Sequence, residues 1–247
     1  SELEGIQTNA KIPSQIRSYK IEQELYTISF ARVFIGTNLN INEKVLIKIY
    51  DKQLIKENEN ELRLINNEIH NLKYCYHRNI LKLYEYIESP NFIFLIMEYF
   101  SGKKLSEVIN SKKKLPEEDS LKIYKQIIGV LVYIHEMNLA NLNLSSENIL
   151  VDNFYHVKIA DFKYSLFYSK KENPSSEYIG EVAFSCPEIH EKKRFSAELV
   201  DTWASGVIFY NMLTGDLPFK SDNQLTLVKL ILKGEYDLPN FINQHCK

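Results

Sequence analysis

The 247-residue sequence lacks features that several protein classes require. Its three cysteines, Cys75, Cys186 and Cys246, are odd in number and widely spaced, which argues against a disulfide framework or a cysteine-based metal cluster. The longest apolar runs fall well short of the roughly 20 residues that a membrane-spanning helix needs. The N-terminus has no charged-then-apolar signal pattern. We therefore expect a cytoplasmic (intracellular) or nuclear protein without a membrane span.

A surplus of one charge is also missing, because 30 Lys and Arg face 32 Asp and Glu, a formal net charge of −2. Nucleic-acid binding by bulk charge depends on a clear positive excess, so we expect no nucleic-acid partner. Hydrophobic residues make up 45% of the chain and charged residues 25%. These values are usual for a folded globular protein with a sizeable core.

What is present is a change of pattern along the chain. Residues 1–18 are polar and aperiodic, and we expect them to form an N-terminal tail. From residue 19 to 97, β-branched and aromatic runs predict strands, with one helix expected between Glu59 and Tyr74. After Gly102 the pattern becomes helical. The chain is thus expected to form a small β-rich part followed by a larger helical part.

Two long helices are expected in the second part. One begins at Pro116, with acidic residues in its first turn, and runs to about Met137. The other follows Ser196 and ends at Gly215, a usual position for a helix-terminating glycine. The apolar stripe of the first helix is expected to consist of Leu121, Tyr124, Ile128 and Leu131.

Seven short segments occur in a fixed order, and each alone would be a weak signal. They are Val45–Lys48 (VLIK), Asn67–Ile69 (NEI), Met97–Tyr99 (MEY), Leu144–Leu150 (LSSENIL), Asp161–Lys163 (DFK), Cys186–Glu188 (CPE) and Asp201–Gly206 (DTWASG).

In this order the segments resemble a eukaryotic protein kinase domain over about residues 19–243. The Glu147-Asn148 ending of the fourth segment is similar to serine/threonine kinases of the calmodulin- and AMP-regulated group. The resemblance implies an α+β bilobal fold with a β-rich N-lobe (19–97) containing one helix, a hinge (98–102) and a larger, mainly helical C-lobe (103–247). The family continues for further helices after this point, so we also expect a shortened C-lobe or a piece of a longer protein.

The resemblance implies a partly retained nucleotide site. Lys48 would bind phosphates and Glu68 would hold it in place, although a plain surface ion pair is the alternative. Asn148 and Asp161 supply the oxygen ligands that Mg²⁺ prefers. ATP and Mg²⁺ are therefore the implied cofactors, with binding expected to be weak or absent. The other implied nucleotide-binding residues are Leu25, Val33, Leu46, Met97, Glu98, Phe100, Leu150 and Ala160.

Two departures from the family pattern affect the binding of the nucleotide and its phosphates. The family's phosphate-covering glycines align with Tyr26, Ile28 and Ala31, so backbone N–H groups lose their close approach and a plain hairpin is expected. The alanine above adenine aligns with the larger Leu46. That side chain either narrows the pocket or turns aside into a repacked core.

The catalytic loop departs further. The family's catalytic aspartate aligns with Asn143, and an amide is not basic enough to accept a hydroxyl proton. Loss of a general base typically costs about 10²–10⁴-fold in rate. The loop lysine that contacts the transferring phosphoryl group aligns with Ser145.

The activation machinery is altered as well. Leu142 replaces the arginine that pairs with a phosphorylated activation loop, Lys163 replaces a glycine, and Glu181 replaces a threonine that seats substrate. Glu177 lies near the usual phosphorylation site, and Ser175, Ser176 and Tyr178 are candidate acceptors.

Two further residues have structural interpretations. Asp201 is expected to accept backbone N–H bonds from residues 141–143. His135 is expected to lie at the end of a core helix, without a carboxylate partner at ligand spacing.

We therefore predict a pseudokinase-like domain with lost or strongly reduced phosphotransfer, acting as a binding or allosteric module with residual ATP affinity and at least one protein partner. The alternative is a divergent serine/threonine kinase that transfers the γ-phosphate of Mg-ATP to protein hydroxyls. A fragment without folded function is a third interpretation.

Overall fold

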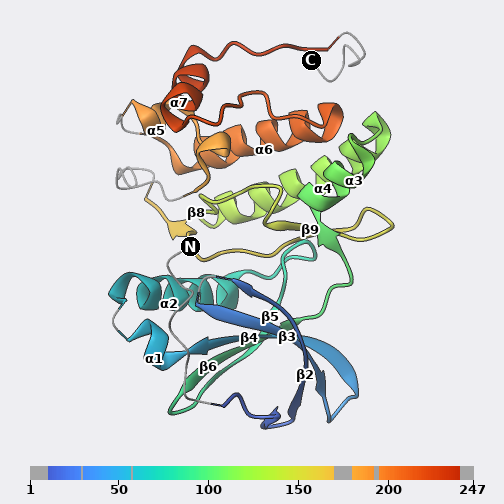
Figure 1. The fold of residues 1–247 in the computed structure, drawn as a ribbon, viewed down its shortest axis with the longest axis vertical. Coiled ribbons are helices and arrows are strands. Elements are labelled where there is room, and N and C mark those ends of the chain that lie inside the picture. Colours follow the sequence, from blue (N-terminus) through green and yellow to red (C-terminus); the bar gives the residue numbers. More distant parts are fainter. Residues whose placement is uncertain (1–10, 29, 57, 170–179, 192–194, 240–247) are drawn as a thin grey trace. The chain divides into compact units, whose positions relative to one another are not determined.

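The computed structural model describes residues 11–28, 30–56, 58–169, 180–191 and 195–239. The chain forms an N-terminal unit (residues 1–76 and 81–101) and a C-terminal unit (residues 77–80 and 102–247). The predicted α+β class is confirmed, since the first unit is built on a sheet and the second is mainly helical (Figure 1). Residues 175–178, which include the candidate phosphorylation sites, and residues 240–247 lie outside the described part.

A six-stranded antiparallel sheet organises the N-terminal unit, with the strand order β1-β2-β3-β4-β6-β5. Burial alternates along residues 45–49, as in a strand that covers a core on one face, and is continuous along residues 92–97. The bounds are β1 (Gln15–Ile16), β2 (Tyr19–Ile28), β3 (Ala31–Asn38), β4 (Glu43–Asp51), β5 (Leu83–Glu88) and β6 (Phe92–Glu98).

The expected tail of residues 1–18 differs from the structure at one place. Gln15 and Ile16 form β1 and pair with Lys20 and Tyr19 of β2. Ile16 also packs against the sheet core, and its burial explains why this polar-looking segment joins the sheet. The boundary of the folded part therefore lies before residue 19.

The register of the sheet fixes which residues share a face. Val33 pairs with Lys48, and Lys48 pairs with Leu95, so these three residues lie on one face. The opposite face carries the buried apolar cluster that includes Phe34, Ile47 and Ile96. Lys48 thus lies on the face of the sheet opposite this apolar cluster.

The predicted helix of the N-terminal unit is confirmed as α2 (Glu59–Tyr74), preceded by the short α1 (Lys52–Ile55). The Asn58 side chain accepts the Glu61 backbone N–H at 3.0 Å and caps the first turn of α2. Ile65, Ile69 and Leu72 are buried, while Leu62 is exposed.

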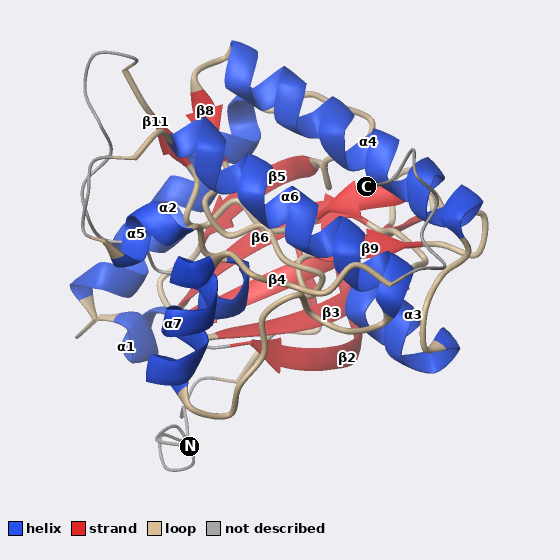
Figure 2. Ribbon diagram, turned by 90° about the horizontal axis from the view of Figure 1, so that it is seen from above, coloured by secondary structure: helices blue, strands red, loops and turns tan. Residues whose placement is uncertain are grey.

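Helices α4 and α6 pack against each other at the centre of the C-terminal unit (Figure 2). Helix α6 ends where predicted, because Gly215 has φ +84° and a Cβ there would lie 1.7 Å from the Lys113 carbonyl oxygen. The elements of this unit are β7 (Lys103–Lys104), α3 (Leu105–Lys112), α4 (Glu117–Glu136), β8 (Leu139–Ala140), β9 (Ile149–Val151), β10 (Val157–Ile159), β11 (Leu166–Phe167), the 3-10 helix η1 (Val182–Phe184), α5 (Pro187–His190), α6 (Ala197–Thr214) and α7 (Gln224–Lys233).

The apolar stripe predicted for α4 is only partly right. Leu131 is buried, but Leu121, Tyr124 and Ile128 are half-buried. Helix α4 packs against α6, β8 and β10, and its buried residues repeat at the same spacing of three and four, one position before the predicted ones. Its fully buried residues are Ser120, Ile123, Ile127, Val130 and Ile134.

Small sheets complete the C-terminal unit, in the order β10-β9-β7 and as the pair β11-β8. They position the loop between β8 and β9 and the segment after β10, which carry the predicted catalytic and metal residues. Among the described residues, no helix combines the length and apolar character needed to cross a bilayer.

Candidate functional site

A buried ion pair joins β4 to α2. The Lys48 Nζ donates to both carboxylate oxygens of Glu68, at 2.9 Å to Oε1 and 2.8 Å to Oε2. The Lys48 side chain is 14% exposed and that of Glu68 is 1% exposed. The structure therefore excludes the alternative of a solvated surface ion pair.

A third group, which the sequence analysis missed, belongs to this pair. Tyr50 is 1% exposed, and its Oη donates to Glu68 Oε2 at 3.1 Å. Burial raises the pKa of Tyr50, so its hydroxyl remains a donor. The spacing from Lys48 to Tyr50 was a usable signal, because alternate residues of a strand share a face.

Three of the predicted apolar residues share the Lys48 face of the sheet. Val33 lies directly opposite Lys48, and Leu46 pairs with Met97. Val33 and Met97 are buried, whereas Leu46 is half-buried. Leu46 is absent from the core cluster on the opposite face. Leu46 thus lies on the Lys48 face, and the narrowing of an adenine pocket by this side chain stays a prediction.

The remaining predicted residues of the N-terminal unit lie at its borders. Leu25 is 40% exposed and occupies a bulge in β2, between the residues that pair with Phe34 and Val33. Glu98 ends β6, and its backbone N–H donates to the Lys82 carbonyl at 2.8 Å, so this donor is already used within the unit. Phe100 follows β6 and is half-buried.

The segment that aligns with the glycine loop is a plain β2–β3 hairpin, as predicted. Ladder pairing continues to Ile28, which pairs with Ala31. Tyr26 and Ile28 are 45% and 47% exposed. The positions that align with the first two glycines therefore carry large, exposed side chains.

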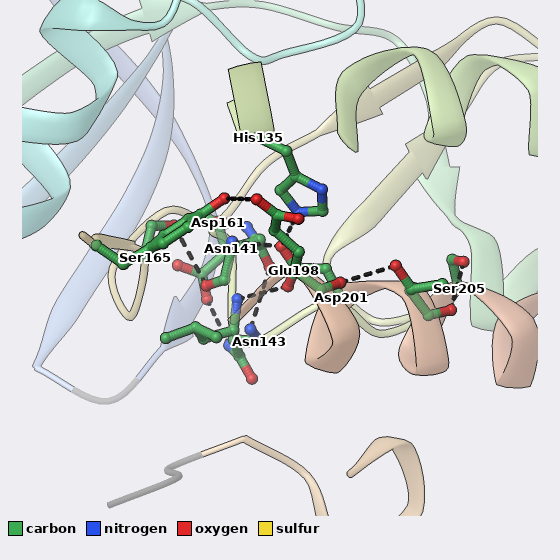
Figure 3. Close-up of polar contacts among 11 residues, drawn as sticks. His135, Asn141, Asn143, Asp161, Ser165, Glu198, Asp201 and Ser205 are labelled. Atoms are coloured by element: carbon green, nitrogen blue, oxygen red, sulfur yellow. Dashed lines mark hydrogen bonds and ion pairs between the residues drawn. The ribbon is translucent and has the colours of Figure 1, made fainter. Parts of the chain in front are cut away.

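Asparagine side chains tie the catalytic loop to the segment after β10 (Figure 3). Asn143 Nδ2 donates to Asp161 Oδ2 at 3.1 Å, and Asn141 Nδ2 donates to the Asp161 carbonyl at 2.8 Å. Asn148 Nδ2 donates to the Asn143 carbonyl at 2.9 Å. The structure thus brings together Asn143, Asn148 and Asp161, which the sequence analysis singled out.

The loop is also held from below by Asp201 (Figure 3). This fully buried carboxylate accepts the backbone N–H groups of Asn141 and Leu142, each at 2.8 Å, which confirms its predicted structural role. His135 lies in the last turn of α4, as predicted, and its Nε2 lies 2.9 Å from Asp201 Oδ2. Helix packing brings these residues together, 66 positions apart, and their spacing gave no signal.

Leu142 lies where the family has its phosphate-pairing arginine. Its backbone has φ +62°, and its side chain packs against an apolar cluster of Cys186, Phe195 and Val200. Burial raises the pKa of Cys186 to about 11, as expected for an inert core thiol. An apolar contact of Leu142 therefore stands where the resemblance implies an arginine that pairs with phosphate.

The two replaced residues Ser145 and Glu181 contact each other. The buried Ser145 Oγ donates to Glu181 Oε1 at 3.2 Å. Partial desolvation is the main cause that raises the pKa of Glu181, and the nearby Glu147 carboxylate adds to it. A neutral hydroxyl and a carboxylate therefore stand where the resemblance implies a lysine and a threonine.

Leu150 and Ala160 lie beside the metal-ligand candidates. Leu150 is in β9 opposite Lys158 of β10, and the Ala160 N–H donates to the Asn148 carbonyl at 3.0 Å. Both residues are half-buried. They connect the two segments that carry Asn148 and Asp161.

Similarity to known proteins shows the family to which the chain belongs. The family model "Protein kinase domain" matches residues 19–245. The chain belongs to the protein kinase family. The kinase domain is 31% identical to "Maternal embryonic leucine zipper kinase" of Xenopus tropicalis over 233 residues. This alignment covers 92% of the chain and 35% of the relative.

A second relative has a similar sequence identity. The kinase domain is 30% identical over 235 residues to "Serine/threonine-protein kinase SIK1" of Rattus norvegicus, covering 95% of this chain and 30% of the relative. The chain thus spans about a third of the length of these curated relatives.

The family generally uses ATP and Mg²⁺, and the donors present fit a magnesium ion in type. Asp161 offers a carboxylate and Asn148 an amide oxygen, both hard oxygen ligands. In the described part of the kinase domain no three His, Cys, Asp or Glu residues form a metal cluster. That is usual for Mg²⁺ held by one or two protein groups, water and phosphates, and Lys48 would supply the positive charge for phosphate.

Proposed function

We propose that this kinase domain has lost phosphotransfer or retains very little, and acts as a binding or allosteric module with residual nucleotide affinity. One contrast carries the proposal. The Lys48–Glu68 pair is formed and buried, whereas the position of the catalytic base holds an amide that donates to Asp161.

The chemistry of the loop supports reduced transfer. A general base must accept the hydroxyl proton, and the Asn143 amide has no basic atom for it. Ser145, which replaces the phosphoryl-contacting lysine, is neutral and hydrogen-bonded to Glu181. Transition-state charge on the phosphoryl group therefore loses one cation and gains a nearby carboxylate.

The second candidate is an active serine/threonine kinase. Its support is the similarity to relatives whose names describe them as kinases, together with Lys48, Glu68, Asn148 and Asp161. Asn143→Asp discriminates between the two candidates. Under our proposal, wild type gives only background phosphotransfer and Asn143→Asp raises it. Under the second candidate, wild type already transfers phosphate above background.

The same proposal implies a protein partner, because a binding module acts through another protein, with nucleotide as its small ligand. We also propose that the protein is cytoplasmic or nuclear and has no nucleic-acid partner. Leu46, on the Lys48 face, limits the room for adenine, so nucleotide affinity is weak.

Thermal unfolding with ATP tests the proposal, with Mg²⁺ in one series and a chelator in another. Ligand at 100 times its dissociation constant adds about 2.7 kcal/mol to the free energy of unfolding. We expect a ligand-induced shift in the wild type that is lost in Lys48→Ala, each variant being compared with its own ligand-free midpoint. A cooperatively folded chain that never shifts would contradict the nucleotide part of the proposal.

A further inference from the structure

The carboxylate of Asp161 already has two donors from its own unit. The Lys163 backbone N–H donates to Oδ1 at 2.9 Å, and the Asn143 amide Nδ2 donates to Oδ2 at 3.1 Å (Figure 3). Each oxygen of the proposed metal ligand therefore accepts at least one hydrogen bond. A cation approaching Oδ2 meets the positive end of an amide dipole.

Asn143 is held so that this donor faces the carboxylate. Its backbone N–H donates to Asn141 Oδ1 at 3.2 Å, and its carbonyl accepts Asn148 Nδ2 at 2.9 Å. The Asn141 side chain in turn donates to the Asp161 carbonyl. Rotating the Asn143 amide by half a turn would direct its oxygen at the carboxylate, which electrostatics disfavours.

We infer that the Asn143 amide takes the place of a cation beside Asp161 and lowers the affinity of this carboxylate for divalent metal. The inference rests on the proposed role of Asp161 as a metal ligand. It gives Asn143 a positioning role beyond the absence of a base, because an amide donor stabilises the ionised carboxylate without metal.

The inference predicts an order of metal affinities. Asn143→Leu keeps the approximate size and removes the amide donor that faces Oδ2. Asn143→Asp replaces the donor by a second carboxylate next to Asp161, which repels it in the absence of metal and shares a cation in its presence. Affinity is expected to rise from wild type to Asn143→Leu and further to Asn143→Asp.

Binding of Mn²⁺ alone measures this order without any catalytic readout. Electron paramagnetic resonance of free Mn²⁺ gives the bound fraction, and thermal unfolding of each variant verifies cooperative folding. We expect Asn143→Asp to bind Mn²⁺ at least about 10-fold more tightly than wild type, and Asn143→Leu a few-fold more tightly. Metal-free Asn143→Asp should melt below wild type and recover on adding Mn²⁺.

Two controls make the outcome decisive. Adding Asp161→Asn to Asn143→Asp should abolish the gain, which assigns the cation to Asp161. If Asn143→Leu does not fold, Asn143→Ala removes the same donor. Donor-deleted variants that bind Mn²⁺ no more tightly than wild type would overturn the inference. Failure of nucleotide binding would leave this order of Mn²⁺ affinities unchanged, so the two proposals fail separately.

Discussion

The β4–α2 pair and the β8–β9 loop show how differently two parts of one kinase domain have diverged. Around Lys48, full charges remain, buried and in contact, with Tyr50 as an additional donor to Glu68. Around Asn143, amides and a serine have replaced charged groups, yet the hydrogen-bond network is complete enough to hold the loop.

The difference teaches that a loop without a basic group at this position can still be held firmly by hydrogen bonds. A neutral amide can keep the shape of a loop while removing its basicity, because hydrogen bonding and proton transfer make different demands on an atom. A buried ion pair allows less substitution, since removing one charge leaves the other uncompensated. The two regions should therefore respond differently to substitution.

The largest effect is expected for Lys48→Met, which leaves Glu68 buried without its cation. Breaking a buried pair in this way costs about 3–5 kcal/mol in the free energy of unfolding. Urea unfolding measures it. The control is Lys48→Met with Glu68→Gln, which removes both charges and should unfold at a higher urea concentration than Lys48→Met alone. Equal midpoints would contradict the account of a coupled pair.

Tyr50→Phe should have the next largest effect. It removes the hydroxyl that donates to Glu68, and a hydrogen bond to a charged group contributes about 1.5–3 kcal/mol. The same unfolding measurement applies. In a Glu68→Gln background the loss should be smaller, because the acceptor is then neutral. A Tyr50→Phe variant as stable as wild type would mean that Tyr50 is merely packed beside the pair.

Leu142→Arg restores the family residue and should still destabilise. The arginine would replace a half-buried leucine that packs against Cys186, Phe195 and Val200, at a cost of about 1–2 kcal/mol. Leu142→Met, which keeps the volume, should lose less. A Leu142→Arg variant that is more stable than wild type would show that the arginine binds an anionic partner and that the apolar contact is dispensable.

The smallest effect is a pH dependence at Glu181. Its pKa in the folded state is raised above the ordinary value of 4.5, so the folded protein binds a proton more tightly than the unfolded chain. Stability from this group is present at low pH and is lost as pH rises through the raised pKa. Glu181→Gln, which keeps an acceptor for Ser145, should melt above wild type at pH 7. The difference should shrink as pH falls toward 4.5.

Much of the fold was predictable because the signals were local. Runs of β-branched and aromatic residues, the acidic first turn of α4 and Gly215 each specify an element on their own. Gln15 and Ile16 were missed because a two-residue strand has no period. The α4 stripe was misplaced by one position, because Leu121, Tyr124 and Ile128 have the same spacing as the buried Ser120, Ile123 and Ile127.

The candidate site was predictable only residue by residue. The resemblance identified Lys48, Glu68, Asn143 and Asp161, but not that an amide would donate to Asp161. Contacts such as His135 with Asp201 join residues from different elements, and only tertiary packing reveals them.

The most direct test of the central claim is phosphate transfer from ATP to a generic serine/threonine substrate protein, comparing wild type with Lys48→Met. The account predicts that both give the same background signal, while ATP still shifts the wild-type melting temperature. Transfer by the wild type that Lys48→Met abolishes would contradict it and identify the domain as an active kinase.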